Sequence, residues 1–302
     1  MKIIHHNDLD GRAAAHVVAE EFKVVNLINQ SEYGDSIFSK DDFFEINYGI
    51  DFPHKMIGRD ETVFILDFSI PKEDMLKLLV KTDNVYWIDH HVTAINKYED
   101  IENFDGIKGI RDGTEVYSGC ELTWMYLNIK NLQTEKLEDY YEDIPYYIRL
   151  IGDRDTWQWR YKDQTLNYFA GAELYEQDPM NKDWEYLKNT KKIIEEGKIV
   201  EHYKRNHYKE YLHDYAYEVE FEGYKANIVN VSKCDNKIFD SIENLHEMQI
   251  WYVFDGKKYR VSLRSAEDCD IDVGSIAQKY GGGGHRHASG FECDKLPWRE
   301  IK

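Results

Sequence analysis

The chain has 302 residues, with 38 basic and 57 acidic side chains and a formal net charge of −19 at pH 7. This acidic balance argues against a long nucleic-acid footprint, which needs many Lys and Arg side chains on phosphates, but it leaves room for a short phosphorylated substrate. Hydrophobic residues make up 42% of the sequence, so a sizeable core is expected and wholesale disorder is not.

Cysteine usage and hydropathy indicate the cellular compartment in which the protein is expected. The four cysteines are scattered and form no C-x-x-C pair, so neither a zinc knuckle nor a thioredoxin-type motif is supported. Scattered cysteines fit a reducing cytoplasm better than a disulfide framework. The N-terminus lacks the apolar core of a signal peptide, and no stretch approaches the roughly 18 apolar residues of a membrane helix. We therefore expect a cytoplasmic protein without a membrane partner.

The chain is predicted to begin with a short strand over residues 2–5, an acidic loop and an Ala-rich helix over residues 12–22. Asp8 and Asp10 stand two residues apart in the loop, and Gly11 permits a sharp turn, so both carboxylates can point to one place. The Asp-x-Asp-Gly pattern also occurs in calcium loops. The Ala-rich residues that follow do not supply the further oxygen ligands that a calcium loop needs.

Apolar runs at residues 24–28, 62–67 and 85–88 predict further strands. Pro71 marks the first turn of a helix that reaches about Lys81. Strands that alternate with helices in this way imply a parallel α/β sheet.

Three of the predicted strands end in acidic or imidazole side chains. These are Asp8 and Asp10 after the first strand, Asp67 after the third, and Asp89-His90-His91 after the fourth. In an open α/β sheet, ligands bind beyond the carboxyl ends of the strands. A lone Asp-His-His triplet could be a capped helix start or a solvated turn. Three such ends on one edge of a sheet favour a divalent metal as the counter-charge.

The middle of the chain is predicted to be helical over residues 119–127 and 138–151, and the second helix runs into Gly152-Asp153-Arg154-Asp155. Two aspartates that flank an arginine could form a surface ion pair, or could donate the last carboxylate to the metal site; the spacing alone leaves both open. Residues 183–215 are highly charged and predict a helical connector between two domains.

After the connector the pattern changes to strands. Hairpins are predicted within residues 217–231 and 248–263, followed by a helix over residues 272–280 that Asp272 would cap. This segment indicates a second, smaller α/β domain.

Four consecutive glycines, Gly281 to Gly284, follow that helix and precede His285-Arg286-His287. Such a run could be a flexible linker. Inside a compact domain, however, successive N–H groups without side chains can form an anion-binding concavity. With Arg264 and Ser265 at the end of the preceding strand, the run predicts a phosphate pocket that needs no large basic surface.

Taken in order, these motifs resemble those of the DHH phosphoesterase superfamily, in the branch that carries a DHHA1 domain. The motifs are His6-Asn7-Asp8-Leu9-Asp10-Gly11, Asp67, Asp89-His90-His91, Gly152-Asp153-Arg154-Asp155-Thr156-Trp157, Arg264-Ser265 and Gly281-Gly282-Gly283-Gly284-His285. Within the superfamily the chain is most similar to the small oligoribonucleases called nanoRNases. The resemblance implies a parallel-sheet DHH catalytic domain over residues 1–182, a helical connector over residues 183–215 and a DHHA1 substrate-binding domain over residues 216–302.

The resemblance also implies a site with two metal ions, usually Mn²⁺, with Mg²⁺ or Co²⁺ as possible substitutes. One metal would be held by His6 and Asp8, the other by Asp10, His90 and Asp153, with Asp67 between them. The implied catalytic residues are His91, Asp67 and Asp89. The implied substrate-binding residues are Arg264, Ser265, Gly282, Gly283, Gly284, His285 and His287.

One position departs from part of the superfamily. Some branches place the first histidine four residues before the first aspartate, where this chain has Ile4. His6 stands only two residues before Asp8, as in other branches, and His5 is the weaker alternative to it. Mixed carboxylate and imidazole ligands suit Mn²⁺ and its neighbours better than calcium or a thiolate zinc site.

The activity implied is that of a two-metal phosphodiesterase that hydrolyses very short oligonucleotides, RNA or DNA, to mononucleotides. Such chemistry needs no serine or cysteine nucleophile. Alternatives on the same metals are an adenosine 3′,5′-bisphosphate phosphatase and a cyclic nucleotide or dinucleotide phosphodiesterase. A non-catalytic nucleotide-binding protein is an alternative of a different class. The expected partner is a short oligonucleotide or dinucleotide, and a homodimer is open because relatives are often dimers.

Overall fold

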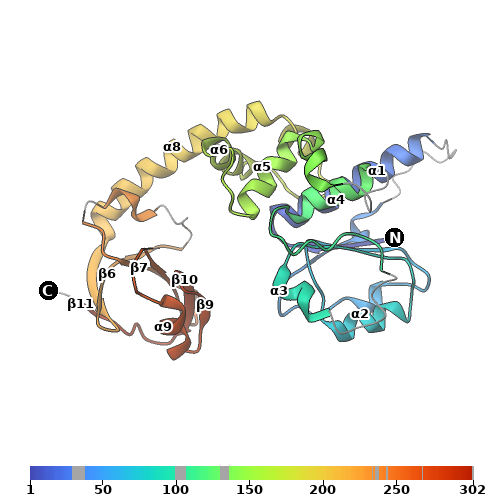
Figure 1. Cartoon of the computed structure of the whole chain (residues 1–302). Coiled ribbons are helices and arrows are strands. Elements are labelled where there is room, and N and C mark those ends of the chain that lie inside the picture. Colours follow the sequence, from blue (N-terminus) through green and yellow to red (C-terminus); the bar gives the residue numbers. More distant parts are fainter. Residues whose placement is uncertain are drawn as a thin grey trace. The chain divides into compact units, whose positions relative to one another are not determined.

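The computed structural model has two compact units, Met1–Val200 and Glu201–Lys302 (Figure 1). Each unit has its own sheet and its own buried core. The structure describes all residues except 29–37, 99–106, 130–135, 233, 235–237, 243, 267 and 301–302. Among the helices so described, none combines the length and apolar character needed to cross a membrane.

The sheet of the first unit is parallel, with its strands in the order β2-β1-β3-β4. The strands are β1 Lys2–His6, β2 Phe43–Ile46, β3 Val63–Leu66 and β4 Val85–Ile88. Every residue of β3 is buried, as expected for a strand that is covered on both faces. The predicted parallel α/β sheet is confirmed, and the carboxyl ends of β1, β3 and β4 lie side by side.

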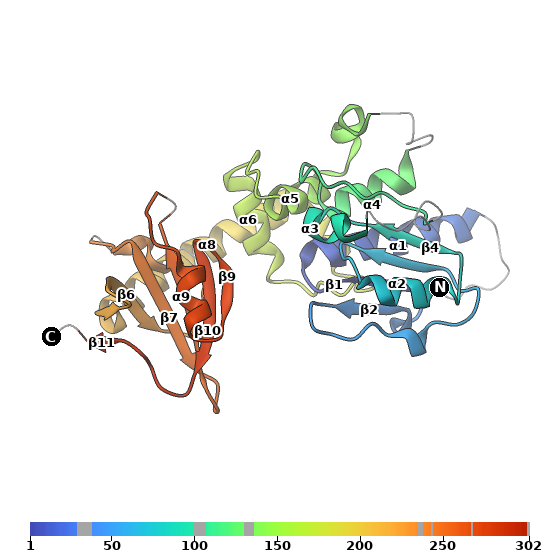
Figure 2. The ribbon, with the colours of Figure 1, turned by 60° about the horizontal axis from the view of Figure 1, so that its bottom comes forward.

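Helices cover both faces of this sheet (Figures 1 and 2). α1 (Leu9–Ile28) and α4 (Gly119–Asn128) lie on one face, and α2 (Lys72–Leu79) and α3 (Val92–Ile95) on the other. Two separate apolar clusters fill the two interfaces, because alternate residues along each strand point to opposite faces.

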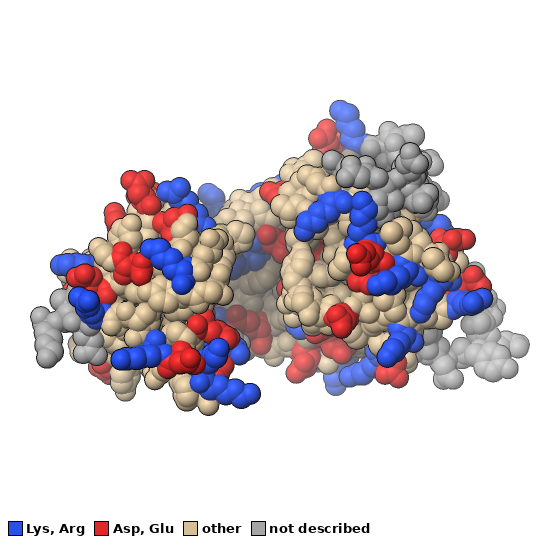
Figure 3. All heavy atoms as spheres, turned by 90° about the horizontal axis from the view of Figure 1, so that it is seen from below, with Lys and Arg blue, Asp and Glu red and all other residues tan. Residues whose placement is uncertain are grey.

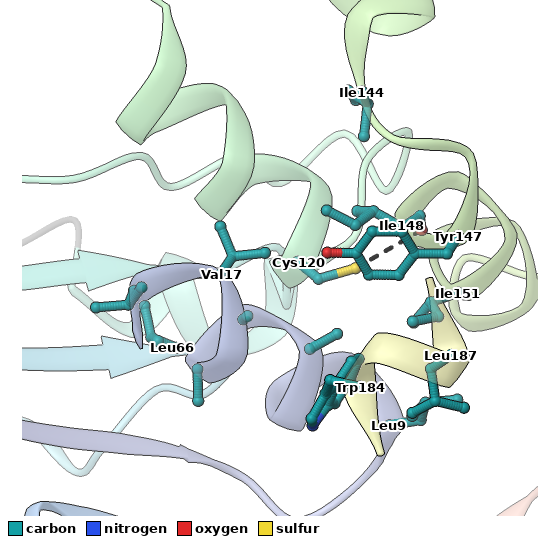
Figure 4. Close-up of a cluster of buried hydrophobic side chains, with 14 of the residues drawn as sticks. Leu9, Val17, Leu66, Cys120, Ile144, Tyr147, Ile148, Ile151, Trp184 and Leu187 are labelled. Carbon is teal, nitrogen blue, oxygen red and sulfur yellow. Dashed lines mark hydrogen bonds between the residues drawn. The ribbon is translucent and has the colours of Figure 1, made fainter. Parts of the chain in front are cut away.

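The cluster on the α1 side also packs α5 (Tyr146–Asp155) and α7 (Trp184–Leu187). Figure 4 shows Cys120 of α4 beside Tyr147 and Ile148 of α5, with Trp184 close by. This packing fixes α1, α4 and α5 relative to the edge of the sheet where the candidate site lies.

Two local predictions are wrong. Residues 24–28 continue α1 instead of forming a strand, and the edge of the sheet is formed by β2, which the sequence did not predict. No Gly or Pro interrupts the helix at this point, so the β-branched run does not stop it. The helix predicted over residues 138–151 is divided at Pro145, which cannot donate a backbone hydrogen bond, and α5 starts after it.

The charged stretch that was predicted as a connector is helical, as α7 and α8 (Thr190–Tyr215). Gly197 lies where α8 touches α6 (Asp163–Ala172); a Cβ there would be 1.6 Å from the Asn167 carbonyl oxygen. Close approach of two helices therefore explains a glycine that weakens helix propensity. The boundary between the two compact units falls inside α8, between residues 200 and 201. Short 3₁₀ helices lie at Lys40–Asp42, His54–Met56, Asn96–Tyr98, Leu137–Asp143 and Ile238–Ser241.

The second unit has a mixed sheet in the order β11-β5-β6-β7-β8-β10-β9. Its elements are β5 Tyr217–Phe221, β6 Tyr224–Asn230, β7 Met248–Phe254, β8 Tyr259–Ser265, α9 Val273–Lys279, β9 Gly283–His285, β10 Ala288–Cys293 and β11 Arg299–Glu300. Both predicted hairpins are confirmed, and so is the helix, which Asp272 caps by accepting a 3.0 Å hydrogen bond from the Ser275 amide.

The glycine run belongs to this sheet. Part of it forms the edge strand β9, which pairs with β10. A Cβ at Gly282 would lie 2.1 Å from the Gly290 carbonyl oxygen, and Gly284 has a φ of +141°. Gly281 and Gly282 precede β9, so only Gly283 and Gly284 of the run belong to the strand. Close packing against β10 accounts for Gly282 and Gly284, and the anion-binding role of the run stays a prediction.

Candidate metal centre

Two aspartates lie where β1 passes into α1. Asp8 accepts a 2.9 Å hydrogen bond from the Gly11 amide and so caps the first turn. Asp10 is buried in that turn and accepts from Ser118 Oγ and from the Gly119 amide, both at 2.7 Å, at the start of α4. Helix ends therefore fix both carboxylates, as the predicted tight acidic loop requires.

Strand alternation separates the two histidines at the end of β1. His5 is fully buried, and its Nδ1 lies 2.8 Å from the His6 carbonyl oxygen. The His6 side chain points the other way, with Nδ1 2.6 Å from Asp8 Oδ2 and 3.7 Å from Asp67 Oδ2. His6 therefore faces the candidate site, and His5 does not substitute for it.

Asp67 follows β3 and lies at the centre of the cluster. It is 1% exposed, and its φ of +54° lies in the left-handed region that a residue with a side chain rarely adopts. A Cβ on Gly119 would be 2.5 Å from the Cβ of Asp67, so glycine at the start of α4 makes room for this aspartate.

The triplet after β4 divides into two roles. His90 Nε2 lies 3.1 Å from Asp67 Oδ1, within the cluster. Asp89 is fully buried and accepts hydrogen bonds from the His91 ring at 2.7 Å, from the His90 amide at 2.8 Å and from the Ser69 hydroxyl. Asp89 thus orients His91 through its Nδ1, which leaves Nε2 of that ring for another partner.

The last carboxylate of the cluster comes from Asp155, whereas the prediction named Asp153. Asp155 Oδ2 lies 3.2 Å from His90 Nε2. Asp153 is buried and accepts hydrogen bonds from the amides of Arg160 (2.7 Å) and Tyr161 (3.2 Å), which secures the loop after α5. Residues two apart on a helix point in directions about 200° apart, so only one of the two aspartates can face the site.

Three overlapping groups of side chains could each hold a cation. Within each group the ligand atoms lie within 4.8 Å of one another. The groups are Asp67 with His90 and His91, Asp67 with His6 and Asp8, and Asp10 with His90 and Asp155. Asp67 and His90 each belong to two groups, so they connect the set.

The donor atoms fit metal ions. Nδ1 of His6, Nε2 of His90 and both carboxylate oxygens of Asp67 are buried, and none makes a well-aligned hydrogen bond to a described residue. Buried polar atoms normally find such a partner, so these four donor atoms fit a site that binds a cation. Carboxylate and imidazole donors together suit Mn²⁺ and related divalent cations.

The charges of the cluster support the same conclusion. Burial and the neighbouring carboxylate of Asp10 raise the pKa of Asp67 well above its usual value. Burial disfavours the charged form of His6, but interaction with Asp67 and Asp8 raises its pKa to about 10. Burial opposes protonation of His90 as well, yet Asp155 and Asp67 raise its pKa to about 12. The carboxylates thus draw positive charge into the cluster.

The predicted substrate-binding residues gather in the second unit, at one end of its sheet. Arg264 of β8 stands opposite Ala288 of β10, which stands opposite His285 of β9, so Arg264 and His285 share a face of the sheet. Ser265 is buried, donates to the Ile271 carbonyl at 3.0 Å and lies 2.9 Å from His287 Nδ1. Ser265 and His287 therefore stabilise the turn, while Arg264 and His285 lie on the opposite face.

Sequence reasoning missed Ser69 and Ser118, which hold Asp89 and Asp10. The signal for Ser118 was present, because Ser118 and Glu121 have the spacing of a capping box at the start of α4. No signal identified Ser69, since its role depends on a contact between separate strand ends.

Comparison with known proteins finds similarity to an oligoribonuclease and to a phosphodiesterase. No family model matches it. Oligoribonuclease NrnB of Bacillus subtilis is 28% identical over 94% of this chain and 71% of its own length. The uncharacterized protein R106 of a mimivirus is 26% identical over 81% of this chain, which spans 56% of that protein.

One solved structure supports the fold. The pGpG-specific phosphodiesterase PggH of Vibrio cholerae aligns with 97% of this chain and 93% of its own, with a TM-score of 0.53 and 12% sequence identity. At that identity the likeness concerns the fold alone. Together with the relative from Bacillus, it confirms the resemblance that the motif order predicted.

Proposed function

We propose that this chain, whose fold and motif order are those of the DHH/DHHA1 phosphoesterase superfamily, is a Mn²⁺-dependent phosphodiesterase that hydrolyses very short oligonucleotides. The observation that carries the proposal is the convergence of five side chains around buried ligand atoms that make no well-aligned hydrogen bond to a described residue; the side chains are Asp8, Asp67, Asp155, His6 and His90. The names of NrnB, an oligoribonuclease, and of PggH, a phosphodiesterase for a linear dinucleotide, support the substrate class.

Two bound metal ions would supply an activated water and would stabilise charge on the phosphate under attack. Asp67, which belongs to two ligand groups, would bridge them. His6 and Asp8 would hold one ion, and Asp10, His90 and Asp155 the other. His91, held through Nδ1 by Asp89, would contact the phosphate or transfer a proton at Nε2.

The second unit would bind the substrate. Arg264 and His285 are two strands apart on one face, which places their backbones about 10 Å from each other. An arginine can hold a phosphate with two parallel hydrogen bonds, and a histidine can add a donor. The assignment of residues 216–302 to the substrate and of residues 1–182 to catalysis rests on this arrangement.

The comparisons do not favour the alternatives with adenosine bisphosphate or a cyclic dinucleotide as substrate. A panel with Mn²⁺ tests the proposal: an RNA dinucleotide, a five-mer, a long single strand, adenosine 3′,5′-bisphosphate and a cyclic dinucleotide. We expect the dinucleotide and five-mer to have the highest kcat/KM. A preference for the bisphosphate or the cyclic compound would reassign the substrate, and no turnover of any of the five would favour a binding protein.

Asp67→Asn tests the metal centre in the same assay. Mutation of a group that merely orients a metal ligand often lowers metal affinity or activity by about 10- to 100-fold. A ligand shared by two groups should therefore cost at least about a hundredfold, with the circular dichroism spectrum unchanged. Near-normal turnover by this variant would refute the two-metal arrangement.

A further inference from the structure

The loop that follows Asp155 has an unusual backbone. Trp157 (φ +58°), Trp159 (φ +55°) and Lys162 (φ +52°) all have positive φ values within six residues. Bulky side chains avoid this region, and residues held there cost of order 1–3 kcal/mol each. Such residues cluster at active sites and ligand clamps, so the loop calls for a functional explanation.

The loop is firmly held. Asp153 accepts from the amides of Arg160 and Tyr161, and its carbonyl accepts from the Gln158 amide at 3.1 Å. The Gln158 side chain donates to the Val116 carbonyl at 2.7 Å. The surrounding structure therefore determines this conformation and keeps it in place.

These contacts hold Trp157 outward. This residue is 54% exposed, although a tryptophan side chain is largely buried on average. The Arg154 guanidinium lies 4.3 Å from the centre of the Trp157 ring, and Trp159 packs edge-on at 5.1 Å. The indole is thus contacted by a cation and by a second indole, and about half of the residue remains exposed to solvent.

Trp157 borders the candidate metal centre. It stands two residues after Asp155, so its Cα lies no more than about 7.6 Å from that of Asp155, which contacts His90. On the other side, Gln158 binds Val116, and Ser118, two residues further on, donates to Asp10. The backbone of Trp157 therefore lies beside the ligand group formed by Asp10, His90 and Asp155.

We propose that Trp157 is a stacking platform for a nucleobase of the substrate whose phosphate lies at the metal centre. This inference rests on the proposed function, because it takes an oligonucleotide as the ligand. Every base has a π-face, so stacking on an indole binds bases of any sequence. Such a site would strengthen the binding of a short substrate that makes few phosphate contacts. The net charge of −19 on the protein disfavours binding through the phosphate backbone of the substrate alone.

The test removes the ring without straining the loop. Trp157→Gly suits a positive φ, so this variant should fold at least as well as the native chain. The matched control is Lys162→Gly, which relieves the same kind of strain in the same loop and removes no aromatic ring. Trp157→Phe keeps a smaller stacking surface and serves as the rescue. Melting temperatures of all three establish that they are folded.

Each protein is assayed with Mn²⁺ on an RNA dinucleotide and on the same compound lacking its bases. We expect Trp157→Gly to lower kcat/KM on the dinucleotide about tenfold, mainly through KM, and Trp157→Phe to recover most of the loss. Lys162→Gly should stay within twofold of the native chain. On the base-free compound all four proteins should be equal.

Two outcomes would overturn the inference. Equal kcat/KM for Trp157→Gly and the native chain on the dinucleotide would show that the ring does not bind the base. An equal loss on the base-free compound would assign Trp157 to the loop or the metals. If the native chain cleaves neither compound, the proposed function fails, and this result is distinct from both.

Discussion

Asp67 combines burial, a left-handed backbone and carboxylate oxygens without a well-aligned hydrogen bond to a described residue. Each of these features is unfavourable in a chain without ligands, and none has a structural benefit in the fold. A bound cation offsets the last of them by coordinating the oxygens. The energetic cost of holding Asp67 in this state, as well as its geometry, therefore indicates that Asp67 is a metal ligand.

Asp155 and Asp153 should respond differently to removal. Asp155→Ala takes a carboxylate from the cluster, so it should weaken metal binding and activity and leave the free energy of unfolding nearly unchanged. Asp153→Ala leaves the partly buried amides of Arg160 and Tyr161 without their acceptor, and the loss of such a partner typically costs about 1–3 kcal/mol. Urea denaturation and metal titration of the two variants measure both effects. The reverse pattern would restore Asp153 as the ligand.

Glu121 gives a pH dependence at the same scale. It is 1% exposed, and burial raises its pKa to about 8 although the Ser118 amide donates to it at 3.0 Å. In the unfolded chain this carboxyl is ionised above its ordinary pKa of about 4.3. The folded state therefore holds one more proton between the two values, and stability falls as pH rises, by at most about 1.4 kcal/mol per unit.

Glu121→Gln removes this dependence and keeps the capping box, because Gln also accepts from the Ser118 amide. We expect the variant to be more stable than the native chain at pH 8 and to show a flatter free energy of unfolding between pH 5 and pH 8. Urea denaturation at each pH measures the free energy of unfolding of both proteins. Identical slopes for the two proteins would mean that Glu121 is ionised in the fold.

At the scale of elements, hydrophobic periodicity predicted β3, β4, α4 and α9 well, because each has its own apolar pattern and end signals. It failed at residues 24–28 and Pro145, where the outcome depends on how far a helix continues. The site followed the same rule. The predicted strand ends identified Asp8, Asp67 and His90 as site residues. Whether Asp153 or Asp155 faces the site depends on the rotation of α5 about its axis, which sequence spacing does not specify.

The glycines of the β9 edge give a test at this scale. A Cβ at Gly282 would lie 2.1 Å from the Gly290 carbonyl oxygen, whereas a Cβ at Gly283 meets nothing within 4 Å. Gly282→Ala should therefore destabilise the second unit by about 1–3 kcal/mol or more, and Gly283→Ala should stay within about 0.5 kcal/mol. Hydrogen exchange of β8 and β10 in the full chain reports the difference. Equal protection in both variants would refute the tight edge.

At the scale of the whole molecule, acidic side chains outnumber basic ones, 57 to 38. On the face drawn in Figure 3, Lys and Arg side chains are interspersed with Asp and Glu over both units. The clustered buried carboxylates Asp10 and Asp67 lie in the first unit. A divalent cation would therefore act on one unit directly, because the second unit contributes no side chain to the three ligand groups found among the described residues.

Metal binding should consequently stabilise the two units unequally. A ligand that binds only the folded state at a hundred times its Kd adds about 2.7 kcal/mol of stability. We expect Mn²⁺ to raise the melting temperature of Met1–Val200, relative to protein in a chelator, and to leave that of Glu201–Lys302 in place. Calorimetry resolves the transitions, and hydrogen exchange of β3 and β7 assigns them. Asp67→Asn is the control that should abolish the shift. An equal shift of both transitions would show that the units unfold together or that the second unit also binds the metal, and no shift would leave the carboxylate cluster without its cation.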